Sequence, residues 1–214
     1  MQSLLRIAQF GLLRAQIAGD GVQLGSELRA HLKLGAVIFH GYSATPDDHW
    51  FGWLAGQLEA DGIHTLVPAL PNPSDPDPTQ WADSVREVLG EPDDRTIVVA
   101  HSLGCLAVMR YLSALPGVWR LGTLVLVAGF TDRLPALPEL DAFIGDGCDV
   151  SGLAKHIGHL AVIRSDDDPL VPPALTDHVA RQFGTSARIV PGAGHFLAAD
   201  GITKLPSVRD AITW

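Results

Sequence analysis

Residues 96–104 read Thr-Ile-Val-Val-Ala-His-Ser-Leu-Gly, and this stretch predicts the fold. Its first five residues form a largely β-branched run, which is typical of a strand buried on both faces of a sheet. Residues 103–115 follow as a helix with almost no polar side, so this helix should lie in the core. A buried strand that passes directly into a helix, with Ser102 at the turn, predicts a nucleophile elbow.

The size of the residues around Ser102 supports an elbow at this turn. An elbow is tight, so the residues two before and two after the serine must be small, and Ala100 and Gly104 are. The usual pattern has glycine in the first of these positions, and alanine departs from it by one methyl group. The alternative is that Ser102 only caps the helix that follows it, because serine is a common N-cap. The turn alone leaves both interpretations open.

Short apolar runs alternate with helical stretches along the rest of the chain. Strands are expected at 36–39, 63–67, 96–100, 121–128, 159–164 and 188–190, and helices at 47–60, 75–90 (opening after Pro78), 103–115, 173–183 and 204–212. This alternation predicts βαβ units and an α/β fold, a three-layer α/β/α sandwich with a mostly parallel central sheet. Ligands in such sheets bind at the carboxyl ends of the strands. An irregular insert at 130–158, with short helices near 137–143 and 150–156, predicts a minimal cap.

Composition limits the classes of protein that remain. The 214 residues are 47% apolar and 18% charged, which excludes a disordered chain. The formal charge of −9 argues against a nucleic-acid partner, which would need clustered lysine and arginine. The two cysteines, Cys105 and Cys148, suggest no disulfide framework and fit a reducing, cytoplasmic setting.

Residues 1–33 are interpreted as an extension to an α/β domain at 34–214. Apolar residues near helical spacing predict an amphipathic helix there; they are Met1, Leu4, Leu5, Ala8, Leu12 and Ala15. Polar residues interrupt the apolar run, so neither a signal peptide nor a membrane span is expected. We expect this helix to pack on its own domain; the alternatives are a membrane-surface helix and a homodimer contact.

A serine hydroxyl needs a base, and nine histidines compete for that role. His195 follows a strand and lies in a loop of small residues, Pro-Gly-Ala-Gly-His-Phe at 191–196, which can bring an imidazole over the sheet. His101 adjoins Ser102, but its side chain should point away from it. His40 ends a strand and is better placed to order its own loop.

The base needs a carboxylate to fix its tautomer. Residues 165–172 read Ser-Asp-Asp-Asp-Pro-Leu-Val-Pro and follow the strand expected at 159–164. Three adjacent carboxylates repel one another, so one is expected to face inward. The chain order Ser102, Asp168, His195 is that of α/β-hydrolases. Because each of these residues follows a predicted strand, the serine interpretation outweighs the capping one.

Several segments together resemble a family of small α/β-hydrolases, the serine hydrolases related to retinoblastoma-binding protein 9 and YdeN. The resemblance extends from Gly35 to about Val208. The segments are HGYSATPDDHWFGWL (40–54), LPNPSDPDPTQW (70–81), VVAHSLGC (98–105), DDPLVP (167–172) and GAGHF (192–196).

The resemblance implies a role for particular residues. It makes Ser102 the nucleophile, His195 the base and Asp168, directly before a proline, the acid, with Asp167 as the fallback. The implied oxyanion donors are the backbone N–H groups of Leu103 and Tyr42.

Two departures limit what is inherited. Ala100 replaces the usual glycine, and residues 1–33 have no counterpart in the compact family core.

The function expected from all this is a serine hydrolase that cleaves a small ester, thioester or amide through an acyl-enzyme at Ser102. No cofactor or metal is expected; His156 and His159 are three residues apart, but no matching carboxylate motif flanks them. Trp81 and Phe130 are candidates for the substrate pocket, each as readily explained as core. The alternative is a protein of this fold that acts mainly by binding other proteins.

Overall fold

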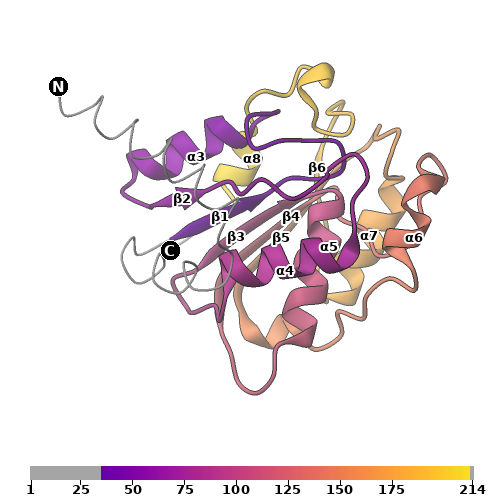
Figure 1. Cartoon of the computed structure of the whole chain (residues 1–214). Coiled ribbons are helices and arrows are strands. Elements are labelled where there is room, and N and C mark those ends of the chain that lie inside the picture. Colours follow the sequence, from indigo (N-terminus) through magenta and orange to yellow (C-terminus); the bar gives the residue numbers. More distant parts are fainter. Residues whose placement is uncertain (1–34, 213–214) are drawn as a thin grey trace. The chain divides into compact units, whose positions relative to one another are not determined.

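The structure is a computed structural model that describes residues 35–212. Its centre is a six-stranded sheet in the order β2-β1-β3-β4-β5-β6, and all five strand pairings are parallel (Figure 1). The strands are β1 (Ala36–Phe39), β2 (Thr65–Leu66), β3 (Ile97–His101), β4 (Leu121–Val127), β5 (Ile157–Ser165) and β6 (Arg188–Val190). Because the strands are parallel, their carboxyl ends meet at one edge of the sheet.

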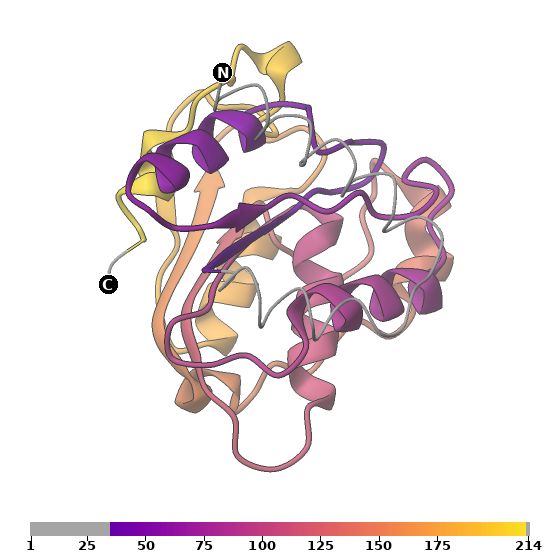
Figure 2. The same ribbon diagram turned by 60° about the vertical axis from the view of Figure 1, so that its left-hand side comes forward.

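Helices cover both faces of the sheet. α4 (Pro78–Leu89), α5 (Leu103–Ala114) and α7 (Pro173–Gln182) share one core cluster with the sheet. α3 (Phe51–Ala60) and α8 (Pro206–Arg209) belong to a second cluster on the other face (Figure 2). The remaining short elements are η1 (Pro138–Leu140), α6 (Asp141–Ile144), η2 (Leu153–His156) and η3 (Ala198–Asp200). The predicted three-layer α/β/α sandwich is confirmed.

The first four residues of strand β3 are all apolar, and the packing of the sheet explains why. Val98 and Ala100 belong to the cluster with α4, α5 and α7, whereas Ile97 and Val99 belong to the cluster with α3 and α8. Side chains alternate between the two faces of a strand, and both faces of this sheet are covered. Residues 97–100 are therefore apolar on both faces of this central strand, and only His101 at its carboxyl end is polar.

Three elements are clearly shorter than the sequence predicts, and two of them precede α4. The strand expected at 63–67 is reduced to β2, because the Ile63 N–H donates to Leu58 O at the end of α3 and Pro68 has no N–H for a ladder. The helix expected at 47–60 begins only at Phe51, because His49 has a φ of +55°, which no right-handed helix accommodates.

The C-terminal helix expected at 204–212 is also shorter and forms the single turn α8. Pro206 stands at its first helical position, where a missing N–H costs nothing. Strand β5, in contrast, starts two residues before the predicted 159–164 and ends one residue after it.

The insert between β4 and β5 is short and tied to α5. The Arg110 guanidinium donates to the carbonyl oxygens of Phe143 (2.8 Å), Gly147 (3.2 Å) and Ile144. These bonds hold the insert against the sheet's helical layer, in keeping with the minimal cap that the sequence predicts.

The amphipathic helix predicted for residues 1–33, and its membrane or dimer role, lie outside the described residues. The boundary predicted between 33 and 34 stays a prediction. Within residues 35–212, no helix has the length and apolar character needed to cross a membrane.

Candidate active site

Ser102 stands between β3 and α5 in a strained conformation, with φ +54° and ψ −125°. Such a backbone costs about 1–3 kcal/mol for a residue other than glycine. Its N–H donates to Val127 O at 2.9 Å, which fixes the turn to the neighbouring strand. The hydroxyl makes no capping hydrogen bond to the helix, so Ser102 does not serve as a side-chain N-cap.

Two glycines allow other backbone to approach the turn closely. A Cβ at Gly41 would lie 2.8 Å from the Ser102 Cβ, and a Cβ at Gly104 would collide with the His40 carbonyl oxygen. The loop after β1 therefore lies directly against the serine and the start of α5.

The structure brings the three predicted side chains together. The Ser102 hydroxyl donates to His195 Nε2 at 2.9 Å, and His195 Nδ1–H donates to Asp168 Oδ2 at 2.7 Å. The exposed fractions are 4% for Ser102, 4% for His195 and 9% for Asp168. The other carboxylate oxygen of Asp168 accepts the N–H groups of Leu170 and Val171, both at 2.9 Å. The carboxylate is thus held by its own turn while it faces the imidazole.

The other two carboxylates of the Asp-Asp-Asp run hold the loop that carries His195. Asp166 Oδ1 accepts the Gly192 N–H, and Asp167 Oδ1 accepts the Gly194 N–H, each at 2.8 Å. Asp167 also accepts the Ser165 hydroxyl. The Ser165 bond, followed by the Gly194 bond, keeps the pKa of Asp167 below its usual value. One carboxylate faces inward, as predicted, and the neighbouring two accept backbone N–H groups of the loop that carries His195.

Both backbone groups of His195 are also bonded. Its N–H donates to Asp200 Oδ2 at 2.9 Å, and its carbonyl oxygen accepts His101 Nε2–H at 2.9 Å. The sequence predicted only that the His101 side chain points away from Ser102, and it predicted no contact with His195. The only signal was a polar residue at the end of a strand that is otherwise apolar. Burial lowers the pKa of His101 well below its usual value, so the ring is neutral.

The predicted oxyanion donors lie in the two segments that meet at Ser102. Leu103 is the first residue of α5, so its N–H has no partner within the helix. Tyr42 follows Gly41 in the loop after β1. His40 orders this loop, as expected from sequence: its Nδ1–H donates to Gly41 O, and its Nε2 accepts the Leu70 N–H, both at 2.9 Å.

Trp81 and Phe130, the candidate pocket residues, are fully buried in the core. The Trp81 indole N–H donates to Pro71 O at 2.8 Å, which ties α4 to the proline-rich loop. A substrate contact by either residue stays a prediction.

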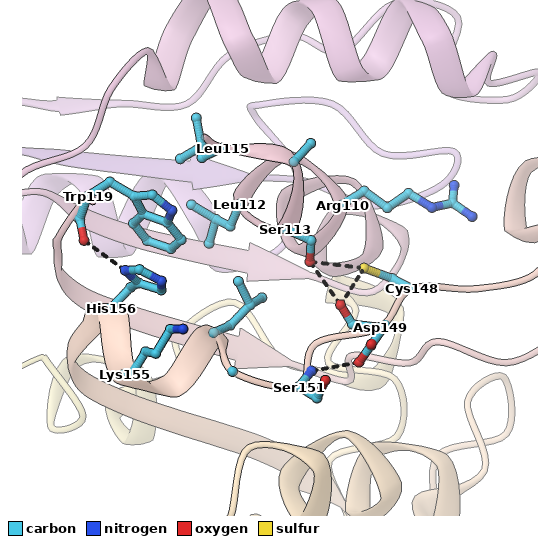
Figure 3. Close-up of a pocket in the computed structure, with 13 residues that line it drawn as sticks. Arg110, Leu112, Ser113, Leu115, Trp119, Cys148, Asp149, Ser151, Lys155 and His156 are labelled. Carbon is cyan, nitrogen blue, oxygen red and sulfur yellow. Dashed lines mark hydrogen bonds between the residues drawn. The ribbon is translucent and has the colours of Figure 1, made fainter. Parts of the chain in front are cut away.

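A separate cavity of about 560 Å³ lies at the other edge of the sheet (Figure 3). It is lined by the end of α5 and by residues that precede β4 and β5, whereas Ser102 follows β3. His156 stacks on Trp119 here, with ring centroids 4.4 Å apart, and its Nδ1–H donates to the Trp119 carbonyl. Residues 35–212 contain no group of three or more side chains suited to hold a metal ion.

Comparison with known proteins agrees with the fold. The sequence is 39% identical over 176 residues to YdeN of Bacillus subtilis (strain 168), which is named as a hydrolase; the match covers 82% of this chain and 93% of YdeN. It is 26% identical to the serine hydrolase RBBP9 of Rattus norvegicus over 77% of this chain and 87% of that protein. The crystal structure of the B. subtilis ydeN product superposes with a TM-score of 0.78 at 38% identity, covering 82% and 94% of the two chains.

The parallel sheet, with a serine on a strained turn between strand and helix, defines the class as α/β-hydrolases. A family model described as serine hydrolase matches residues 36–214. The chain belongs to this serine hydrolase family, as the resemblance in its sequence predicted.

Proposed function

We propose that this protein hydrolyses a small ester, thioester or amide through an acyl-enzyme at Ser102. The observation that carries the proposal is the continuous chain of contacts from hydroxyl to imidazole to carboxylate, at 2.9 and 2.7 Å. A serine hydroxyl becomes a competent nucleophile when a base takes its proton, and both distances lie within hydrogen-bond reach.

The proposed reaction has two halves. In the first, Ser102 Oγ attacks the substrate carbonyl carbon and its proton passes to His195 Nε2. The imidazolium then protonates the leaving group as the bond between that group and the acyl carbon breaks. In the second, His195 takes a proton from water while the water oxygen attacks the acyl carbon, and the imidazolium returns that proton to Ser102 Oγ as the bond between Oγ and the acyl carbon breaks. Asp168 stabilises the imidazolium in both halves and does not itself take the proton.

The negative charge that develops on the carbonyl oxygen needs donors. The N–H groups of Leu103 and Tyr42 are proposed for this, because the glycine at 41 brings their two segments together around Ser102. In comparable sites, one such donor is worth about 10²–10³ in turnover. The amino end of α5 adds a favourable dipole.

The insert between β4 and β5 is short, which favours a compact substrate over a long chain. The steps themselves call for neither cofactor nor metal. We also propose a reducing, cytoplasmic compartment, which the two free cysteines, Cys105 and Cys148, support.

A panel of small esters, thioesters and aminoacyl amides tests the proposal on wild-type protein and Ser102→Ala. We expect hydrolysis of at least one compound by the wild type and none above background by the variant. Equal turnover by both proteins would contradict the proposal. Inertness of the folded wild type towards the whole panel would favour a protein-binding role for this fold.

A further inference from the structure

We propose that His101 is a positioning residue that sets the distance between the nucleophile and the base, through its bond to the His195 carbonyl. This inference rests on the proposed function. His101 is directly bonded to Ser102 along the chain, and its Nε2–H donates to His195 O at 2.9 Å. One side chain therefore joins the elbow to the backbone of the base.

The surroundings fix the His101 ring in place. It is 2% exposed and its centroid lies 4.9 Å from that of His195. On other sides it meets the rings of Trp50 (6.0 Å), Phe51 (5.8 Å) and His49 (5.9 Å). Because packed aromatic neighbours leave little room for another rotamer, the donor atom has a fixed position relative to Ser102.

A core histidine at this position is costly. His101 Nδ1 is buried and has no hydrogen-bond partner among the described residues. An unsatisfied buried nitrogen destabilises a fold, and an apolar side chain of similar volume would avoid that penalty. Strand β3 is otherwise apolar at every position. Among the described residues, the His101 side chain makes one hydrogen bond, to the His195 carbonyl oxygen. This bond offsets part of the cost of burying the ring and indicates why a histidine stands at this position.

The protonation state of His101 is also defined. A carbonyl oxygen only accepts, so the proton is on Nε2, and desolvation by burial keeps the ring neutral. The His101 ring thus places no positive charge beside His195 when that ring becomes an imidazolium during the reaction. A permanent cation in the same place would oppose this step.

The role of the bond follows from the arrangement of His195. Asp200 holds the His195 N–H, Asp168 holds its Nδ1–H, and His101 holds its carbonyl. Of these three, only His101 is next to Ser102. Loss of its donor leaves the imidazole, its carboxylate and the other bonds of the base loop intact, but removes the bond that ties the His195 backbone to the residue next to Ser102. A shift of about 1 Å in such an alignment costs about 10²-fold in rate.

Three variants of the full chain test this inference. His101→Phe keeps an aromatic ring but no donor, and His101→Asn has an amide too short to reach the carbonyl. His101→Gln places its amide nitrogen near the position of Nε2 and should restore the bond. His178→Phe, on α7, is the control. The readouts are kcat and KM for p-nitrophenyl acetate, the labelling rate with a fluorophosphonate, and thermal unfolding.

We expect His101→Phe and His101→Asn to lose about 10²-fold in kcat with little change in KM, since substrate contacts remain. His101→Gln should recover most of the lost turnover, and His178→Phe should match the wild type. A purely structural role would instead lower the melting temperature and leave kcat per folded molecule unchanged, which would overturn the inference. If one variant does not fold, the other non-donor variant and the glutamine rescue decide. A wild type inert to both reagents would overturn the proposed function itself.

Discussion

The nucleophile turn at 97–104 and the base loop at 192–200 end in side chains that touch, yet they are built differently. The turn is set mostly by its own neighbours: a buried strand, small residues on either side and an apolar helix. The base loop is held by side chains far away in sequence. Asp166 binds Gly192 across 26 positions, Asp167 binds Gly194 across 27, and His101 binds His195 across 94.

The nucleophile turn therefore depends mainly on local sequence, whereas the base loop depends on the whole fold. Changes at the turn act on the reacting oxygen, so their effects should be very large. Changes around the base loop act through orientation, so their effects should be graded according to which contact is lost.

The largest effect is expected at the hydroxyl. Ser102→Ala should lower kcat on the order of 10⁶-fold, as happens when members of a triad act as a unit. The double variant Ser102→Ala, His195→Ala should lose no more than the single one, because either change disables the same step. Steady-state kinetics on the best ester of the panel measures both. Additive losses would mean that the two side chains work independently.

Substitution of two of the three adjacent carboxylates, Asp167 and Asp168, should have clearly different effects on kcat. Asp168→Asn should lower kcat about 10⁴-fold, because the amide favours the wrong tautomer of His195. Asp167→Asn keeps an oxygen that accepts from the Gly194 N–H, so its loss should be far smaller. Kinetics of the two variants side by side measure this difference. Equal losses would show that the wrong carboxylate was assigned.

The turn also predicts a steric effect. Gly41→Ala places a methyl group 2.8 Å from the Ser102 Cβ, closer than real Cβ atoms approach. We expect kcat to fall about 10²-fold, because the hydroxyl and the Tyr42 N–H are displaced together. Gly52→Ala is the matched control: nothing lies within 4 Å of its added carbon in α3, so its kcat should equal that of the wild type. Unaltered kcat in both variants would refute the tight packing at the elbow.

The smallest effect concerns stability and pH. Burial lowers the pKa of His40, His49 and His101 in the folded chain, so the unfolded chain binds more protons below pH 6.5. The free energy of unfolding should therefore be greatest above about pH 6.5 and decline as the pH falls towards 5. His101→Gln removes one of these groups and should show a shallower decline, by up to about 1.4 kcal/mol per pH unit. Urea unfolding at a series of pH values tests this; parallel curves would count against a neutral, buried His101.

Sequence reasoning reached the parts of the site that local patterns encode. The strand, turn and helix at 96–104 could be predicted because apolar periodicity and small residues act over a few positions. His195 and the run of three carboxylates could be named because each follows a strand and the strands are parallel. The choice of Asp168 within that run came from the family resemblance. The contact between Asp168 and His195 was a prediction of topology, and the structure places it within hydrogen-bond distance.

Other features lay beyond sequence reasoning. The left-handed backbone of His49, which delays the start of α3, has no sequence signature. The bonds of Asp166 and Asp167 to the base loop depend on how two loops meet in space, and so does the His101 bond to His195 O. Trp81 and Phe130 were predicted as pocket candidates, but both are fully buried. Sequence alone does not separate the two cases, because aromatic residues suit a pocket and a core equally well.

The most direct test of the central claim is labelling with a fluorophosphonate, followed by intact-mass measurement and peptide mapping. Phosphonylation needs a serine whose proton a neighbouring base removes, so it reports the contact between Ser102 and His195 without knowledge of the natural substrate. The account predicts one adduct per folded wild-type chain, located on Ser102, and none on His195→Ala over the same time. A pure, folded wild type that takes up no label, or takes it up at another residue, would contradict the account.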